Sequence, residues 1–408
     1  MWGIVEQPEN HESVFACLQE ELASVERRFQ RQLDVDIPPV GRLCRYIECY
    51  RGKMLRPTIT ILSGLAAAAS VIEQQRLADS ANLNRERFPR TSTAKPDRSR
   101  RLQPHTASRP SETPSPSVSD LRHFIGESHR VLAAVTEMVH MATLVHDDVL
   151  DEAEMRRRGA TVNYLHGNEA AVLLGDFLIS NAFHLCSTLG RPELNERIGA
   201  VTNSMCAGEL LQLHHRNDWS LDAATYYEII NRKTASLIGV CCELGAAESG
   251  ADSDIARALG EYGRKLGMAF QIQDDLLDLI GEEFVVGKSL GRDLEKRKLT
   301  LPIILYFQTV SPSEREDTLA LLGTTNGDSD RSGTESREIE SSTGRCPNPQ
   351  ATESSLRARL AESGAIQKAH AEATRLVDEA KEELRLLRPS PALDLLREMA
   401  IAVVARKF

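Results

Sequence analysis

Two short groups of aspartates carry the residue types that suit metal chemistry. They begin at Asp147 and Asp274, 127 positions apart in a chain of 408 residues, and each has the pattern D-D-x-x-D. The members are Asp147, Asp148 and Asp151 in the first motif and Asp274, Asp275 and Asp278 in the second. On a helix the first and last carboxylates share a face and the second lies beside them, so each motif gathers like charges that need a cation between them.

The chemistry of these side chains points to Mg²⁺. Carboxylate oxygens suit this ion, which usually bridges one or two carboxylates to substrate phosphates. No His or Cys is spaced to suggest zinc instead, and we interpret His146, His214 and His215 as ordinary helix residues. We therefore predict that both motifs bind metal.

Basic residues accompany both motifs, and together they predict a site for more than one diphosphate. An apolar stretch precedes each motif, at 136–145 and 266–273, which indicates an apolar cavity with a charged mouth. The basic residues are Arg156, Arg157 and Arg158 after the first motif, Lys288, Lys296, Arg297 and Lys298 after the second, and Lys53, Arg56 and Lys233 elsewhere. The stretch 281–289 has the wrong spacing and no preceding strand for a nucleotide-binding P-loop, so we reject that reading.

Composition narrows the class of protein. Apolar residues make up 41% of the chain but aromatics only 5%, which favours helices built from Leu, Ala, Ile and Val. The net charge of −10 argues against nucleic acid as a partner.

The eight cysteines form no C-x-x-C pair and are interpreted as small buried hydrophobes. The acidic start lacks a signal-peptide pattern and no long uncharged apolar run appears, so we expect a cytoplasmic protein that does not span a membrane.

The elements that position the motifs are predicted to be helices. Residues 1–408 are expected to form a single domain, an all-α bundle with a central cavity. Two disordered inserts are expected to interrupt it: 84–119, rich in Pro, Ser and Thr, and 323–354, rich in Ser, Thr and Gly. Helix starts are expected at Ser220 or Asp222, and at Ser253. The predicted helices are 124–149, 169–189, 194–214, 223–248, 254–279, 353–387 and 392–405.

At this point the sequence resembles the trans-polyprenyl diphosphate synthases, in particular the medium- and long-chain octaprenyl, heptaprenyl and hexaprenyl enzymes. The likeness spans nearly the whole chain apart from the inserts. The stretches that carry it are GKMLRP from Gly52, HMATLVHDDVLDEAEMRRRGATVN from His140, GDFL from Gly175, KT at Lys233, FQIQDDLLD from Phe270 and GKSLGRDLEKRKLTLP from Gly287. Arg158 departs from the Gly or His found in many members.

The resemblance implies an isoprenoid-synthase fold, usually a homodimer, and a role for each matching position. The six aspartates would hold Mg²⁺ ions that bridge an allylic diphosphate. That diphosphate would be contacted by Arg156, Lys233, Thr234, Gln271, Lys288 and Lys298. Isopentenyl diphosphate would be held by Gly52, Lys53, Arg56, His140 and Arg157. The implied reaction adds isopentenyl diphosphate head-to-tail to an allylic diphosphate such as farnesyl diphosphate.

Product length is predicted from the helix before the first motif. Stepping back from Asp147 by single turns reaches Thr143 and then Val139, with Ala142 beside them, and none is aromatic. Family members with short products tend to carry an aromatic residue four or five positions before the first Asp. One turn is about 5.4 Å, close to one isoprene unit, so the open turns predict a product of about thirty to fifty carbons, as in quinone side chains. Met138 or residues near Leu174 are alternative positions at which a side chain would close the product tunnel and limit the chain length.

Three alternatives stay open. A terpene cyclase would share the metal chemistry, but Lys53, Arg56 and the pair Arg156-Arg157 indicate a second substrate site. A farnesyl or geranylgeranyl diphosphate synthase differs only in product length. A non-catalytic subunit of a heteromeric synthase would usually lack the acidic motifs. Transient membrane contact for product release is a further expectation.

Overall fold

A computed structural model describes residues 12–50, 52–87, 116–156, 159–280, 296–322 and 349–405. These residues form an all-helical bundle, as predicted, and two short strands, β1 (Met155–Arg156) and β2 (Gly159–Ala160), pair antiparallel beside it. The helices of the first half are α1 (Glu12–Leu33), α2 (Pro38–Tyr50), α3 (Leu55–Arg87), α4 (Val118–Arg122), α5 (Glu127–Leu150), α6 (Val162–His166) and α7 (Asn168–Ser187).

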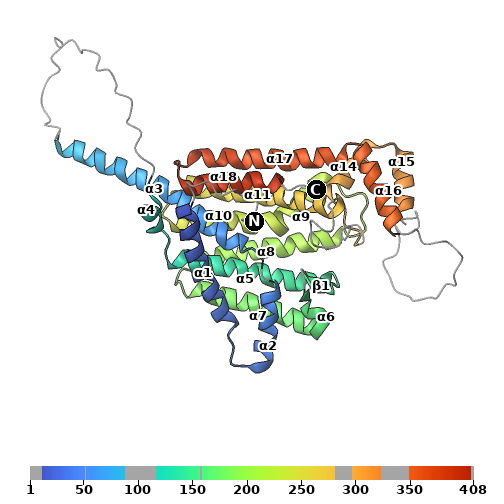
Figure 1. The fold of residues 1–408 in the computed structure, drawn as a ribbon, viewed down its shortest axis with the longest axis horizontal. Coiled ribbons are helices and arrows are strands. Elements are labelled where there is room, and N and C mark those ends of the chain that lie inside the picture. The colour runs from blue at the N-terminus through green and yellow to red at the C-terminus, as the bar shows by residue number, and fades with distance from the viewer. Residues whose placement is uncertain are drawn as a thin grey trace, which may run out of the picture.

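The second half continues the bundle and covers it (Figure 1). It contains α8 (Pro192–His214), α9 (Ala223–Ile230), the π-helical segment η2 (Asn231–Ala235), α10 (Ser236–Glu248), α11 (Ser253–Ile280), α14 (Leu301–Thr309), α15 (Pro312–Leu321), α16 (Pro349–Glu362), α17 (Ala365–Glu383), the 3₁₀ turn η3 (Leu384–Leu386) and α18 (Pro391–Val404).

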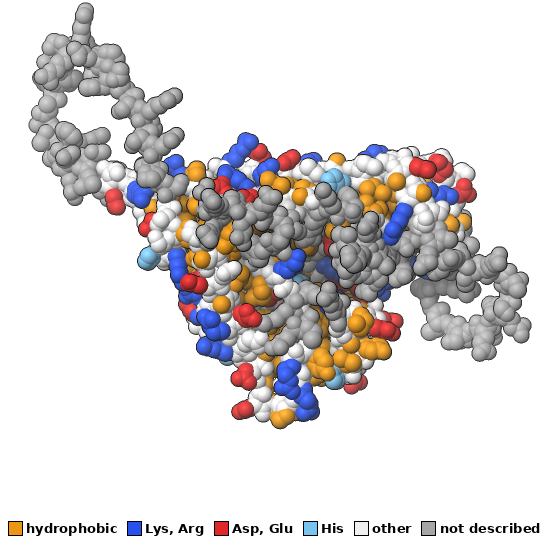
Figure 2. All heavy atoms as spheres, in the orientation of Figure 1, with side chains coloured by type: hydrophobic (Ala, Val, Ile, Leu, Met, Phe, Trp, Pro, Cys, Tyr) orange, Lys and Arg blue, Asp and Glu red, His pale blue; other side chains and the backbone are white. Residues whose placement is uncertain are grey.

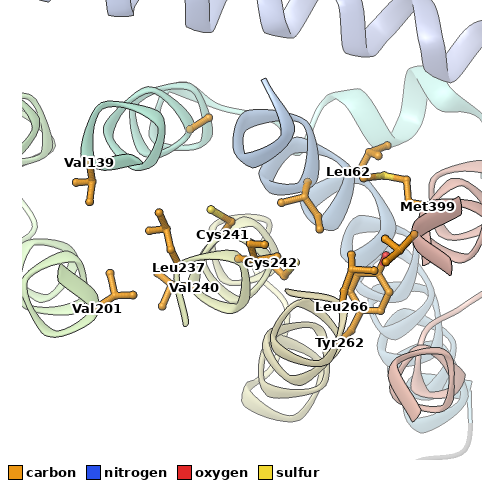
Figure 3. Packing of buried hydrophobic residues seen from close by; sticks show 14 of the residues in the cluster. Leu62, Val139, Val201, Leu237, Val240, Cys241, Cys242, Tyr262, Leu266 and Met399 are labelled. Atoms are coloured by element: carbon orange, nitrogen blue, oxygen red, sulfur yellow. The ribbon is translucent and has the colours of Figure 1, made fainter. Parts of the chain in front are cut away.

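Helix α10 lies at the centre of the bundle. It packs against α3, α5, α8 and α11, and most of its side chains are buried. Figure 3 shows Leu237 and Val240 of α10 near Val139 of α5 and Val201 of α8, while Cys242 faces the α11 side. Because α10 is apolar around nearly its whole circumference, it is stable only inside such a shell of helices.

Helix ends follow local side-chain chemistry. Asp222 caps α9 by accepting a hydrogen bond from the Thr225 amide, as predicted. The predicted helix start at Ser253 is confirmed, since Ser253 is the first residue of α11, but the capping side chain is the preceding Asp252, whose carboxylate accepts a hydrogen bond from the Ile255 amide at 2.9 Å.

Several predicted boundaries need correction. The helix predicted at 223–248 is interrupted by η2, and the one predicted at 353–387 breaks at Gly364, whose φ of +72° ends a right-handed helix. The ends of both proposed inserts are helical, because α3 continues to Arg87, α4 begins at Val118 and α16 begins at Pro349. Most of each insert lies outside the described residues.

Two helices of the described chain have the length and composition to cross a membrane. They are Leu55–Ser80 within α3, whose apolar window is 83% buried, and Asn168–Ser187, whose window is 39% buried. The first packs into the bundle as a core helix does. The second, α7, keeps part of an apolar surface exposed.

Candidate active site

The two aspartate motifs lie near the C-terminal ends of α5 and α11. Both helices run toward the end of the bundle where β1 and α14 lie (Figure 1). The first motif ends α5, with Asp151 as its C-cap, and the second lies in the last two turns of α11. The predicted convergence of the motifs on one region therefore follows from the parallel course of these helices.

Asp147 faces the cluster around Lys233. The Lys233 ammonium lies 3.8 Å from Asp147 Oδ2, forms an ion pair with Glu209 and donates to Gln212 Oε1 at 2.9 Å. Burial raises the pKa of Asp147, and Glu209 and Asp151 add to the rise while Lys233 opposes it. This carboxylate thus lies where added positive charge is favoured.

Asp148 turns away from Asp147 and is almost fully buried. Arg156 donates to its Oδ1 through Nε at 2.8 Å, and Arg156 Nη2 lies 2.7 Å from the same oxygen. Tyr50 lies beside Asp148, and its hydroxyl oxygen accepts a hydrogen bond from the Val162 backbone amide at 3.1 Å. Arg156, predicted to contact diphosphate, is therefore also tied to the first motif.

Asp151 is surrounded by cations. Its carboxylate lies 2.9 Å from Lys296 Nζ, 3.2 Å from Lys298 Nζ and 3.8 Å from Arg216 Nη2. Burial alone would raise the pKa of Asp151, but Lys298 and Lys296 outweigh it and lower that pKa. The structure thus brings predicted Lys298 to the first motif, although it lies after the second in sequence.

The second motif is organised around Asp275. Its Oδ2 accepts a hydrogen bond from the Tyr226 hydroxyl at 2.6 Å, and its Oδ1 accepts one from the Gln271 side-chain amide at 2.8 Å. Gln271 in turn accepts the Thr234 hydroxyl at 3.1 Å. The predicted residues Thr234, Gln271 and Asp275 therefore form one hydrogen-bonded chain between η2 and α11.

A cavity of about 110 Å³ collects these predicted residues. It lies between the end of α8, α9, η2, α11 and the segment before α14. Its walls include Tyr226, Lys233, Thr234, Gln271, Asp275 and Lys298. A wider hollow between α2 and the α6–α7 corner, lined by Leu43, Tyr46 and His166 among others, contains none of the predicted site residues.

Among the residues predicted to hold isopentenyl diphosphate, Gly52 and Lys53 directly precede α3, Arg56 lies in its first turn and His140 lies on α5. Gly52 and Lys53 are exposed, while Arg56 and His140 are partly buried. Burial lowers the pKa of Arg56, and the neighbouring Glu137 opposes that shift. Because Glu137 is one helical turn before His140, Arg56 and His140 border the same part of α5.

Met54, between Lys53 and Arg56, has a φ of +51°. Side chains with a Cβ rarely adopt this left-handed conformation, and it costs of order 1–3 kcal/mol. Such strain is frequent where backbone is held for binding. Arg157, Arg158 and Lys288 lie outside the described residues.

The residues predicted to govern product length lie behind the first motif. Val139 and Ala142 are fully buried and Thr143 is partly buried. In Figure 3 Val139 points into the space between α5, α8 and α10. Met138 and Leu174, the alternative positions for closing the tunnel, are also buried.

Gly175 in the GDFL stretch has a packing role. A Cβ at this position would lie 2.1 Å from His146 Nε2, so only glycine lets the imidazole rest on α7. His146 Nε2 also lies 3.1 Å from the Val172 carbonyl oxygen. His146 is thus a docking residue between α5 and α7, in agreement with its reading as an ordinary helix residue.

The donor set fits a hard divalent cation, since the charged side chains of the two motifs offer only oxygen. Among the described residues, no three His, Cys, Asp or Glu side chains form a complete site by themselves. Mg²⁺ commonly takes one or two carboxylates and completes its shell with phosphate and water. These carboxylates would therefore suit a divalent cation that takes its remaining ligands from a phosphate and water.

Sequence reasoning missed several residues of this site, among them Glu209, Tyr226 and Glu137. Glu209 lies on α8 and pairs with Lys233 of η2, and Tyr226 lies on α9 and donates to Asp275 of α11, so no spacing rule could find them. Glu137 did carry a signal, because it is the only acidic residue between Val131 and Val145 and is nearly fully buried. A buried lone charge in an apolar helix calls for a partner.

Comparisons with known proteins agree with this geometry. The sequence matches the family described as Polyprenyl synthetase over residues 118–336. It is 29% identical to the octaprenyl diphosphate synthase of Escherichia coli (strain K12) over 75% of this chain and 78% of that protein. It is 33% identical to the short chain isoprenyl diphosphate synthase of Methanothermobacter thermautotrophicus over 68% of this chain and 79% of that protein.

A solved structure shares the fold. The polyprenyl synthase of Caulobacter crescentus CB15, solved with calcium and isoprenyl diphosphate, superposes with a TM-score of 0.73 at 26% identity, over 98% of this chain and 99% of that one. Taken together with the paired aspartate motifs and the cations around them, these matches show that the chain belongs to the polyprenyl synthetase family.

Proposed function

We propose that this prenyltransferase uses Mg²⁺ to build a trans-polyprenyl diphosphate of about thirty to fifty carbons, of the size used for quinone side chains. The reaction class follows from family membership: isopentenyl diphosphate is added head-to-tail to an allylic diphosphate, and the family uses a divalent metal. The observation that carries the assignment is the placement of Asp147, Asp151, Lys233 and Lys298 around one site.

The residues of the site suit each step of that reaction. Breaking the allylic C–O bond leaves its electron pair on the diphosphate, and bound divalent metal supplies positive charge that stabilises this leaving group. Lys233, fixed by Glu209 and Gln212, adds a preorganised cation on the α8 side. Lys298, which pairs with Asp151, adds a second cation from the other side of that carboxylate.

The second substrate then attacks. The double bond of isopentenyl diphosphate forms the new C–C bond with the allylic cation, and loss of one proton restores an alkene, for which the released diphosphate is the nearest base. Lys53 and Arg56 hold this substrate at the α3–α5 junction, so that its double bond lies about 3–3.5 Å from the cation. The apolar helices behind Asp147 exclude water that would quench the cation.

The chain-length proposal rests on the absence of aromatic side chains at the three positions behind Asp147. Purified chain, Mg²⁺, labelled isopentenyl diphosphate and farnesyl diphosphate should give products of about thirty or more carbons. Products that stop at fifteen or twenty carbons would contradict the proposed product length but would still agree with the proposed prenyl-transfer reaction. Folded chain that forms no product alone would favour a subunit of a heteromeric synthase.

We also propose a homodimer that pairs through α7 and α8. Exposed apolar side chains on these helices include Leu173 at 67% and Leu210 at 66% exposure, with Val172 and Leu213 nearby. In Figure 2 hydrophobic side chains also gather on the surface near α6. A patch of this kind on a soluble helix marks an interaction surface.

The association is tested by light scattering after size-exclusion chromatography. Leu173→Glu places a charge on the α7 surface and should convert a dimer to a monomer. Leu386→Glu, at another exposed apolar position, serves as the matched control and should leave the mass unchanged. A wild-type monomer would disprove the homodimer. If the dimer is confirmed, unchanged association in Leu173→Glu would disprove this interface.

A further inference from the structure

The second aspartate of the second motif is held by a side chain that the metal chemistry does not require. Asp275 is 5% exposed, and each of its oxygens accepts a hydrogen bond from protein, Oδ2 from Tyr226 and Oδ1 from Gln271. Tyr226 is itself 3% exposed and lies on α9, a helix separate from the motif. Its hydroxyl is therefore a fixed donor between two elements of the site.

The direction of Asp275 follows from helix geometry. Neighbouring residues on a helix are about 100° apart, whereas residues four apart share a face. When Asp275 points toward Tyr226, Asp274 lies about 100° and Asp278 about 60° away from that direction around α11, both on the same side of it. Fixing one carboxylate of the motif thus fixes the rotation and position of the other two.

The first motif has a parallel arrangement. Asp148, its second aspartate, is 1% exposed and is bound by Arg156, with Tyr50 beside it. Tyr50 lies on α2, again outside the helix that carries the motif. In both motifs, then, the middle carboxylate is buried beside a tyrosine from another helix. The outer carboxylates of the first motif face Lys233 and Lys296, whereas Asp278 of the second motif is as buried as Asp275.

We propose that Tyr226 is a positioning residue of the synthase, whose hydroxyl, through Asp275, orients the second aspartate motif for binding of metal with diphosphate. The inference rests on the proposed metal-dependent function. Tyr226 lines the cavity, but its hydroxyl is bonded to Asp275, so its effect is transmitted through that carboxylate. Partners that orient metal ligands typically contribute about 10–100-fold to metal affinity or activity.

The test compares Tyr226→Phe with Tyr227→Phe. Both remove one phenol oxygen from α9, but Tyr227 lies near Glu372 of α17 rather than near Asp275. Isothermal titration with inorganic diphosphate in the presence of Mg²⁺ should show binding about 10-fold or more weaker in Tyr226→Phe. Tyr227→Phe should stay within about twofold of the wild type.

Kinetics give a second readout that a general loss of stability would not produce. Tyr226→Phe should raise the half-saturating Mg²⁺ concentration and lower kcat, while the KM for isopentenyl diphosphate stays unchanged, because that substrate is held at the α3–α5 junction. Equal effects of the two phenylalanine variants, or unchanged diphosphate binding in Tyr226→Phe, would overturn the proposal. A wild-type chain that does not bind diphosphate with Mg²⁺ would instead overturn the proposed function.

A second comparison covers the case in which Tyr226→Phe does not fold. Asp275→Asn keeps an oxygen that can accept from Tyr226 but removes the buried charge. Adding Tyr226→Phe in that background removes the donor without leaving a buried carboxylate short of a partner. The double variant should bind diphosphate with Mg²⁺ about 10-fold more weakly than Asp275→Asn alone, and equal binding would overturn the positioning role.

Discussion

The ammonium group of Lys296 lies 2.9 Å from the carboxylate of Asp151, the last aspartate of the first motif. Lys298 and Arg216 approach the same carboxylate at 3.2 and 3.8 Å. A divalent cation that binds Asp151 must share or displace these charges. The sequence places Lys296 among the basic residues of the predicted site without a role of its own, and this contact makes it a candidate competitor of the metal.

Replacing Lys296 with Gln should therefore lower the Mg²⁺ requirement. Both partners are partly exposed, and such an ion pair contributes about 0.2–1 kcal/mol, so the half-saturating Mg²⁺ concentration should fall by about 1.4- to 5-fold. The measurements are initial rate against Mg²⁺ concentration and Mg²⁺ titration calorimetry with inorganic diphosphate. Lys368→Gln, an exposed lysine on α17, controls for the change in net charge. An unchanged or higher requirement in Lys296→Gln alone would contradict the competition.

Gly175→Ala should disturb the first motif from a neighbouring helix. The added methyl would lie 2.1 Å from His146 Nε2, so the imidazole beside Asp147 must move. Overpacking of this kind costs typically about 1–3 kcal/mol, measurable as a lower free energy of unfolding in urea. Gly199→Ala is the matched control, since its Cβ would meet only Phe183 at 3.8 Å. If the clash is the cause, His146→Ala should recover most of the loss in the Gly175→Ala background.

Local sequence rules were enough to predict the main helices and the shared helix face of the first and last aspartates of the first motif. Periodic apolar residues located α5, α7, α8 and α11 to within a few positions, because these helices bury one continuous face. The spacing of Asp147 and Asp151 placed both on one helix face without any tertiary information. The basic stretches, by contrast, were assigned through resemblance, and the structure places Lys233 and Lys298 beside carboxylates of the first motif.

Other features depend on contacts that no local pattern contains. The break at Asn231–Ala235 lies inside a periodic helical stretch, and the π-helical turn follows from packing against α8 and α11. The Tyr226–Asp275 hydrogen bond joins residues 49 positions apart. The ring of cations at Asp151 joins α5 to a segment about 145 positions later, so only the folded chain shows that Lys296 reaches it.

His129 should make stability depend on pH. Its Nδ1 accepts the Gly126 amide at 3.2 Å, so the proton is on Nε2, which lies 3.0 Å from both the Gly245 carbonyl and Ser249 Oγ. Burial lowers the pKa of His129 in the folded state, while hydrogen bonding to Gly245 opposes the shift. The unfolded chain therefore binds a proton first, near pH 6.5, and the free energy of unfolding falls as pH drops below that value.

The pH effect is isolated by comparing variants in urea between pH 7.5 and 5. His129→Gln should show a shallower loss of stability toward low pH than the wild type, although its stability at pH 7.5 is lower. His123→Gln removes an exposed histidine whose Nδ1 lies 2.7 Å from the Ser119 carbonyl oxygen, and it should keep the wild-type pH profile. Parallel profiles for wild type and His129→Gln would refute the assignment.

Product length should respond in order to bulk placed behind Asp147. Thr143→Phe puts a ring one turn behind the motif and Val139→Phe puts it two turns behind, and one turn is about the length of one isoprene unit. Thr143→Phe should therefore give the shorter product, about one unit shorter than Val139→Phe, and both should end before the wild type. Ala142→Phe, beside Thr143, should resemble Thr143→Phe. Chromatographic sizing of the dephosphorylated products measures the order directly, and wild-type lengths from all three active variants would show that the tail does not run along this side of α5.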